Sequence, residues 1–124
     1  MENGPFKFST ESIEKLKECH PDLQLVCNEL IKEFNFTVLC GFRNEQEQNA
    51  AFINGRSKEQ WPRSRHNRTP SDAVDLAPWP IDWKNIDRFQ DMIERIEQIA
   101  RNLNIRLRYG KDFSFKDWGH VERA

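Results

Sequence analysis

The sequence lacks the features that mark several large classes of protein. No apolar run approaches the ~20 residues that a membrane-spanning helix requires, which argues against a membrane protein. Its 19 Lys and Arg oppose 20 Asp and Glu, so the formal net charge is −1 and no excess of positive charge indicates a nucleic-acid binder. We therefore expect neither a nucleic acid nor a membrane among its partners.

Cysteine is scarce as well. Cys19, Cys27 and Cys40 are odd in number and show no Cys-x-x-Cys spacing, so the sequence favours neither a disulfide framework nor a thiolate zinc site. We interpret all three as small residues of the hydrophobic core. The N-terminus has neither the basic patch nor the apolar stretch of a secretory signal, so we expect synthesis and retention in a cytoplasm.

The residues that are present suffice for one domain. The chain has 124 residues, and its nine Phe and four Trp supply large side chains for a core. No internal repeat, low-complexity tract or linker divides it. We expect a single domain over residues 1–124 and a monomer.

The first two predicted helices lie close together near the N-terminus. One follows Ser9 and ends where the chain turns at His20 and Pro21. The second begins near Pro21, and its apolar positions follow amphipathic helical spacing as far as Phe34. We interpret His20 as a helix cap or packing residue of this junction.

Two more helices follow later in the chain. Asn44-x-x-Glu47 matches a capping box, which predicts a third helix with Gly55 as its stop. The most regular apolar stripe spans residues 86–103, where the spacing alternates between three and four. This stripe predicts a long helix with one buried face.

Four short segments have the composition or the alternation of strands: residues 36–40, 73–77, 105–109 and 119–122. A long irregular loop is expected over residues 56–72, and a loop of this length in a small domain is usually functional. Helices and strands mix without strict alternation. The sequence therefore predicts an α+β fold in which helices pack on a small, mostly antiparallel sheet.

Two of the three histidines stand beside carboxylates. His66 precedes Asp75 by nine positions, and Asp117 precedes His120 by three. A catalytic zinc site needs three imidazole or carboxylate ligands and an open position, which His66, Asp75 and His120 would supply, leaving Asp117 to accept a proton from water. Spacing alone fits equally well two unrelated surface histidines and an aspartate that caps a turn.

The order of several motifs resembles that of the zinc D-Ala-D-Ala carboxypeptidase and L-alanyl-D-glutamate endopeptidase family, in particular its single-domain phage endolysins. The resemblance covers nearly the whole chain, from about residue 9 to residue 122. The motifs that carry it are His20-Pro21-Asp22-Leu23, Gly41-Phe42-Arg43 with Gln48, Gly55-Arg56-Ser57, Ser64-x-His66, Ala73-Val74-Asp75, Ile81-Asp82-Trp83 and Asp117-x-x-His120.

The resemblance implies a hedgehog/DD-peptidase-like zinc peptidase fold and a role for each matching residue. His66, Asp75 and His120 match the zinc ligands. Asp117 matches the general base that activates water, and Arg43 matches the arginine that steadies the substrate carbonyl and the oxyanion. These roles agree with general metal and oxyanion chemistry.

Three further residues belong to the expected site. Ser64 is expected to orient His66 by hydrogen bonding. Gln48 is expected to line the cleft. Trp118, which stands between two proposed catalytic residues, is either a cleft wall or a core residue.

The sequence departs from the family pattern at two places. The shortest family motif has its aspartate seven positions after the histidine, whereas Asp75 lies nine positions after it; the Ala-x-Asp signature selects Asp75, with Asp72 as the rival. Gly119 and Val121 flank the last histidine, where proline and an aromatic residue are frequent in the family.

The resemblance predicts a zinc peptidase that hydrolyses the L-alanyl-D-glutamate bond in the peptide stem of bacterial peptidoglycan. The alternatives are a D-alanyl-D-alanine carboxypeptidase or dipeptidase, and a non-catalytic zinc-fold binding protein. Such a lysin would be made in the host cytoplasm and act on the cell wall after release. The basic residues between Arg56 and Arg68 would either attract an anionic wall polymer or form a solvated loop.

Overall fold

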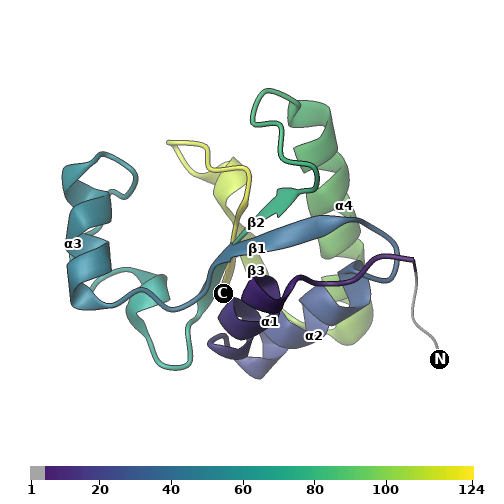
Figure 1. The fold of residues 1–124 in the computed structure, drawn as a ribbon, viewed down its shortest axis with the longest axis horizontal. Coiled ribbons are helices and arrows are strands. Elements are labelled where there is room, and N and C mark those ends of the chain that lie inside the picture. The colour runs from purple at the N-terminus through teal and green to yellow at the C-terminus, as the bar shows by residue number, and fades with distance from the viewer. Residues whose placement is uncertain (1–4) are drawn as a thin grey trace.

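The computed structural model describes residues 5–124 (Figure 1). Within them the main elements run in the order of two helices, a strand, a helix, a strand, a long helix and two final strands. The helices are α1 (Thr10–Lys17), α2 (Pro21–Leu30), α3 (Glu45–Ile53) and α4 (Ile86–Leu103), and the strands are β1 (Phe36–Cys40), β2 (Ala73–Pro78), β3 (Leu107–Tyr109) and β4 (His120–Arg123). The predicted α+β class is confirmed.

The helix boundaries follow from local capping. Ser9 caps α1, and the His20 side chain accepts a hydrogen bond from the backbone N–H of Asp22 at the start of α2, so the cap interpretation of His20 is confirmed. At α3 both halves of the predicted capping box form between Asn44 and Glu47. Gly55, just beyond this helix, has φ +76°, a conformation that glycine adopts without strain.

The four strands form one antiparallel sheet in the order β1-β2-β4-β3. Because side chains alternate along a strand, Val74 and Leu76 of β2 face the core while Asp75 points to the opposite face. The same alternation in β4 buries Val121 in the core and turns His120 to the side of Asp75. The sheet thus separates a hydrophobic face from a polar one.

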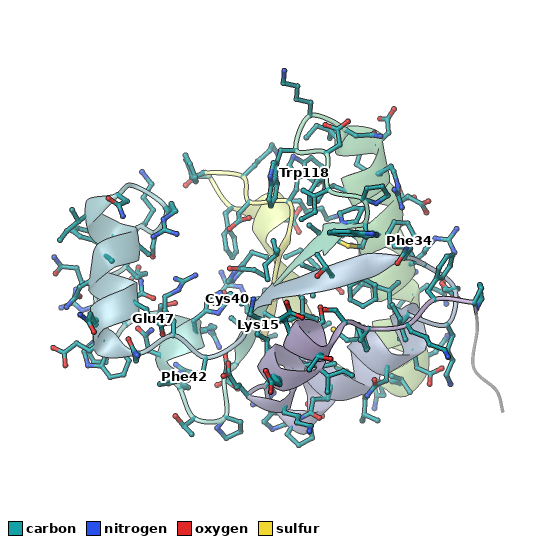
Figure 2. The ribbon with its side chains drawn as sticks, viewed as in Figure 1. Lys15, Phe34, Cys40, Phe42, Glu47 and Trp118 are labelled. Carbon is teal, nitrogen blue, oxygen red and sulfur yellow. The ribbon has the colours of Figure 1, made fainter. Side chains whose placement is uncertain are left out.

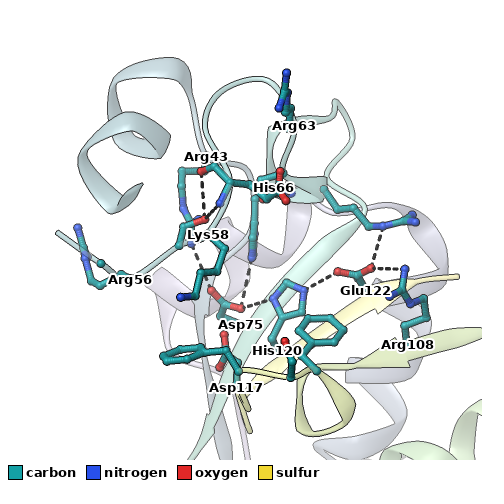
Figure 3. A pocket seen from close by; sticks show the side chains of 18 residues that line it. Arg43, Arg56, Lys58, Arg63, His66, Asp75, Arg108, Asp117, His120 and Glu122 are labelled. Atoms are coloured by element: carbon teal, nitrogen blue, oxygen red, sulfur yellow. Dashed lines mark hydrogen bonds and ion pairs between the residues drawn. The ribbon is translucent and has the colours of Figure 1, made fainter. Parts of the chain in front are cut away.

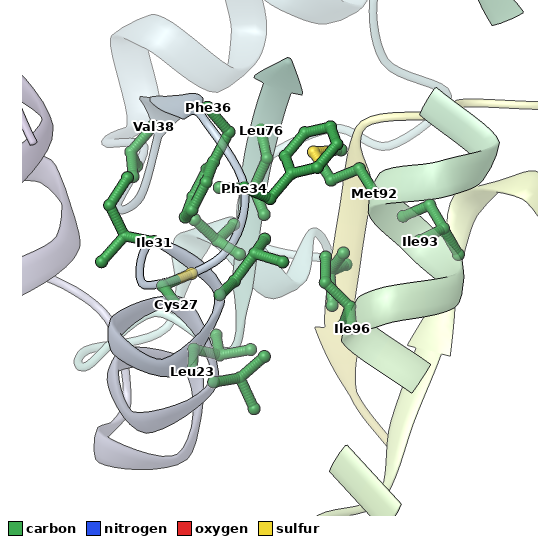
Figure 4. Packing of buried hydrophobic residues seen from close by; sticks show 14 of the residues in the cluster. Leu23, Cys27, Ile31, Phe34, Phe36, Val38, Leu76, Met92, Ile93 and Ile96 are labelled. Atoms are coloured by element: carbon green, nitrogen blue, oxygen red, sulfur yellow. The ribbon is translucent and has the colours of Figure 1, made fainter. Parts of the chain in front are cut away.

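The hydrophobic core lies between the sheet and the helices α2 and α4 (Figure 4). Leu30 of α2 and Met92 and Ile96 of α4 are fully buried there, at 0% exposure. The middle of the predicted stripe, from Phe89 to Ala100, is the buried face of α4, whereas Ile86 and Leu103 at its two ends are exposed. Burial of these side chains supplies the main stabilisation of the domain.

Helix α3 stands apart from the other helices, at the left of the view in Figure 1. The chain that follows it contains the long loop expected over residues 56–72. A short 3₁₀ helix, Arg65–Asn67, which the sequence did not predict, interrupts this loop. A second 3₁₀ helix, Gly110–Asp112, follows β3. The α3 region and these two segments surround the polar face of the sheet.

Two expectations about local structure need correction. The second helix ends at Leu30 rather than near Phe34, because the chain leaves the helix in a turn before β1. Cys19 and Cys27 are buried, but Cys40 is not a core residue: the pairing of β1 with β2 shifts register between Val38 and Cys40, and this irregularity brings the Cys40 thiol toward the polar face.

No helix among residues 5–124 is long and apolar enough to cross a membrane.

Candidate active site

The polar face of the sheet gathers residues from three separate parts of the chain (Figure 3). Asp75 of β2 pairs directly with His120 of β4 in the strand register. His66 comes from the 3₁₀ helix ahead of β2, and its backbone carbonyl accepts a hydrogen bond of 2.8 Å from the backbone N–H of Arg43. Strand pairing and this hydrogen bond bring together residues more than 50 positions apart.

One nitrogen of His66 is held by the backbone, and the other is free. Nδ1 lies 2.7 Å from the carbonyl oxygen of Gly41, to which it must donate, so in the neutral ring the lone pair is on Nε2. Among residues 5–124, this buried Nε2 has no hydrogen-bond partner. It lies 3.3 Å from Oδ1 of Asp75. A buried imidazole nitrogen in this state is suited to coordinate a metal ion.

His120 has the opposite arrangement. Its Nε2 lies 2.8 Å from Oε1 of Glu122, so this nitrogen donates to the carboxylate, and in the neutral ring the lone pair would fall on Nδ1. Nδ1 lies 3.0 Å from Oδ1 of Asp75, the same oxygen that faces His66. The two imidazoles therefore direct different nitrogens toward one carboxylate.

Glu122 is a site residue that the sequence analysis missed. It is 7% exposed, and its Oε2 lies 2.8 Å from Nε of Arg65 and 3.5 Å from an Nη of Arg108. The signal was present in the predicted strand, because residues two apart in a strand share a face and His120 and Glu122 are two apart.

The donor set fits a divalent metal ion. Asp75, Asp117 and His120 offer ligand atoms within 4.8 Å of one another, as do Cys40, His66 and Asp75. The Cys40 thiol approaches Nδ1 of His66, at 3.8 Å, which is the nitrogen that Gly41 already engages. Each group contains one histidine, and Asp75 belongs to both. Two imidazoles and a carboxylate, with water completing the set, form a frequent ligand combination of catalytic metal sites.

The charges of these groups depend strongly on each other. Burial alone would lower the pKa of His66, but the Asp75 carboxylate outweighs burial and raises it to about 10. Burial would also lower the pKa of His120, and hydrogen bonds to Asp75 and Glu122 raise it to about 9. For Asp75, burial is outweighed by the two imidazoles, which lower its pKa. A metal cation can replace the protons that this cluster holds.

Arg43 is fixed beside the cluster by a buried amide. Its guanidinium donates to Oε1 of Gln48 at 3.0 Å and to Oδ2 of Asp75 at 3.4 Å. Gln48 is 0% exposed, and its Oε1 also accepts from Asn67 at 3.1 Å. Gln48 therefore lies behind Arg43 and positions it, rather than lining the cleft as expected.

Asp117 lies on the opposite wall of the site, in the segment between the second 3₁₀ helix and β4. Its backbone N–H donates to the carbonyl of Gly110 at 2.9 Å, and its carbonyl accepts from the backbone of His120 at 3.2 Å. Burial, with the charge of Asp75, raises the pKa of the Asp117 carboxyl. A carboxylate with a raised pKa is a stronger base, as proton transfer requires.

Ser64, Trp118 and Asp72 occupy different surroundings. The Ser64 hydroxyl accepts a hydrogen bond from the backbone N–H of His66 at 3.2 Å, so it caps the 3₁₀ helix rather than touching the imidazole ring. Trp118 is partly buried against the hydrophobic core (Figure 2). Asp72 pairs with Arg68 at 3.0 Å and with Arg123 at 2.9 Å, away from the histidines.

The two histidines, Asp75, Asp117 and Arg43 border a pocket of about 450 Å³. One wall is the segment that follows α3, from Gly55 to Arg63, and the other is the segment from Phe113 to Asp117. The floor holds His66, Asp75 and His120. An open pocket with a carboxylate of raised pKa, a fixed arginine and a cluster of possible metal ligands can support hydrolysis of a polar bond.

Comparison with known proteins gives matches over almost the whole chain. A family model described as phage L-alanyl-D-glutamate peptidase matches residues 4–123. The L-alanyl-D-glutamate peptidase of Escherichia phage T5 is 30% identical over 94% of this chain and 97% of its own. The crystal structure of the L-Ala-D-Glu endopeptidase ChiX of Serratia marcescens superposes with a TM-score of 0.81 at 25% identity, covering 97% of this chain and 92% of that one.

Proposed function

Because the chain belongs to the family of phage L-alanyl-D-glutamate peptidases, we infer that it is a peptidoglycan hydrolase that cleaves the bond between L-alanine and D-glutamate. The match to the phage T5 peptidase over nearly the full length of both chains is the observation that carries this conclusion. Peptidoglycan is accordingly its substrate.

We assign zinc as the metal, with Nε2 of His66, Oδ1 of Asp75 and Nδ1 of His120 as the atoms that would hold it. Support comes from the ligand types, from the unpartnered Nε2 and from the contact of Glu122 with the far nitrogen of His120. When bound, zinc supplies a Lewis acid that polarises the scissile carbonyl and increases the acidity of water.

The protein side chains handle the proton and the developing charge. In the proposed reaction the Asp117 carboxylate accepts a proton from the attacking water, and a bond forms between the water oxygen and the carbonyl carbon of L-alanine. The Arg43 guanidinium stabilises the negative charge on the carbonyl oxygen. When the carbon–nitrogen bond breaks, Asp117 returns the proton to the amine of D-glutamate.

The position of Arg43 supports its role. Gln48 and Asp75 together fix two of its nitrogens, so its charge does not need to be reoriented during the reaction. We propose that the protein acts as a monomer. We also propose that the protein is made in the host cytoplasm and reaches the wall on release, as the phage origin of its relatives suggests.

Metal removal and an Asp117 variant test the mechanism together. The purified protein is incubated with peptidoglycan as isolated, after treatment with a chelator, and after zinc is added back. We expect release of soluble peptides to stop with chelator and to return with zinc. Asp117→Asn should bind zinc like the wild type and cleave at least about 100-fold more slowly.

Two outcomes would contradict this account. Full cleavage by the metal-free protein would show that the reaction does not require a metal. Wild-type activity of Asp117→Asn would show that Asp117 is not the base. No cleavage by fully zinc-loaded protein would instead favour the non-catalytic binding protein that the sequence left as an alternative.

A further inference from the structure

One wall of the pocket carries positive charge that the protein itself does not neutralise. We call Arg56, Lys58 and Arg63 the cationic wall; all three line the pocket, and within residues 5–124 none of them forms an ion pair. The other arginines of the pocket are paired, Arg43 with Asp75 and both Arg65 and Arg108 with Glu122. Since Glu59 is the one acidic residue between positions 55 and 63, the wall retains an excess of positive charge.

The cationic wall is attached to the reaction centre through one buried side chain. Nε2 of Gln48 donates to Oγ of Ser57 at 2.9 Å and to the backbone carbonyl of Glu59 at 2.6 Å. Lys58 lies between these two anchored residues. The same amide accepts from Arg43 through Oε1, so the backbone of Lys58 and the guanidinium of Arg43 share a rigid support.

Lys58 also reaches the opposite wall. Its Nζ lies 5.0 Å from the ring centroid of Phe115, in the segment that carries Asp117. Figure 3 shows the Lys58 side chain between Arg43 and Asp117, whereas Arg56 extends from the edge of the pocket. The ammonium group thus lies between the two walls, near Arg43 and Asp117, the residues that we propose act on the scissile bond.

The chemistry of the substrate supplies a partner for this charge. Glutamate has two carboxyl groups, and a glutamate inside a peptide uses only one of them to extend the chain. The other remains as a free carboxylate on the residue whose nitrogen is released by cleavage. Near the carboxylates Asp75 and Asp117 this group would be repelled unless a cation met it.

We propose that Lys58, flanked by Arg56 and Arg63, binds the free carboxylate of the D-glutamate residue and thereby selects stem peptides in which this group is ionised over those in which it is amidated. The inference rests on the proposed function and adds a substrate preference to it. A charge-assisted hydrogen bond exceeds a neutral one in strength, so the carboxamide is the weaker partner. The cationic wall also favours approach of anionic substrate from solution.

Two synthetic peptides test the proposal. Both contain the sequence L-Ala-D-Glu-L-Lys, and in one of them the free carboxylate of D-glutamate is replaced by a carboxamide. We expect the zinc-loaded wild type to cleave the acid with a kcat/KM about tenfold higher than the amide, chiefly through a lower KM. In Lys58→Gln the ratio of the two kcat/KM values should fall to about twofold or less, because cleavage of the acid loses more than cleavage of the amide.

The control variants separate charge from structure. Lys58→Arg retains the charge and should keep the preference, and Lys84→Gln removes an exposed lysine outside the pocket and should change nothing. Equal cleavage of both peptides by the wild type, or an equal loss of both activities in Lys58→Gln, would overturn the proposal while leaving the peptidase function intact. Failure of the wild type to cleave either peptide would overturn the peptidase function, and the inference with it.

Discussion

Glu122 accepts a hydrogen bond of 2.8 Å from Nε2 of His120, on the side of the ring away from Asp75. In the neutral ring this contact places the proton on Nε2 and leaves Nδ1 free for the metal that we propose. Glu122 is itself held by Arg65, the residue that precedes His66. One buried carboxylate therefore connects the two segments that supply the histidines.

The first prediction concerns this connection. Glu122→Gln keeps the size of the side chain but removes the charge that Arg65 and the His120 N–H both contact, so zinc affinity should fall by about 10-fold or more. Competition with a chromophoric chelator measures the affinity. Glu97→Gln, which removes an ion pair to Lys111 on the outside of the domain, is the matched control. Equal affinity in the two variants would show that Glu122 does not position His120.

The identity of the ligands gives a second prediction. His66→Ala, His120→Ala and Asp75→Asn should each lose stoichiometric zinc, because each removes or weakens one of three ligands. Asp72→Asn should retain one zinc per chain, because Asp72 pairs with arginines instead. Metal analysis after gel filtration counts the zinc. Tight binding of one zinc by either alanine variant, or loss of zinc from Asp72→Asn alone, would refute the assignment.

Asp72 gives a third prediction, about stability and pH. Burial would raise the pKa of Asp72, but hydrogen bonds from Arg123 and Arg68 outweigh it and lower the pKa below the ordinary value. A group whose pKa is lower in the folded state stabilises the protein above its unfolded pKa of about 4, and this contribution is lost as the pH falls further.

Asp72→Asn should therefore reduce the free energy of unfolding by about 1–2 kcal/mol near neutral pH. The difference from the wild type should shrink between about pH 5 and about pH 3. Urea unfolding of the metal-free proteins across this range measures it. A difference that stays constant as the pH falls would mean that ionised Asp72 is not the source of the stability.

Gly110 gives a fourth prediction. A Cβ at this position would collide with the backbone carbonyl of Asp117 and come within 2.9 Å of Cβ of His120. Gly110→Ala must displace the segment that carries the proposed base, so we expect a loss of about 1–3 kcal/mol of stability and a lower kcat. Thermal unfolding and peptide cleavage measure the two effects. Wild-type kcat in this variant would show that the position of Asp117 tolerates the shift.

The sequence was sufficient to predict elements that depend on local signals. The capping box at Asn44, the cap at His20 and the stripe of α4 each involve residues within one or a few turns, and all three occur as predicted. The choice of Asp75 over Asp72 came from the family motif, and the structure places Asp75 between the histidines.

The features that sequence did not predict depend on contacts across the chain. Gln48 was expected in the cleft, but its amide is buried where α3 meets the loop, a position fixed only by tertiary packing. Cys40 was expected in the core, but a register shift between β1 and β2, which no local sequence pattern encodes, places it outside the core. Gly119, where the family often has proline, lies so close to the carbonyl of Leu76 that a Cβ would collide with it.

Identification of the new chain ends in digested peptidoglycan tests the central claim most directly. The zinc-loaded protein is incubated with purified peptidoglycan, and the released amino groups are labelled and assigned by mass spectrometry and chiral analysis. The account predicts new amino-terminal D-glutamate, absent when chelator is present. Release of free D-alanine without new D-glutamate termini would contradict it and identify a carboxypeptidase instead.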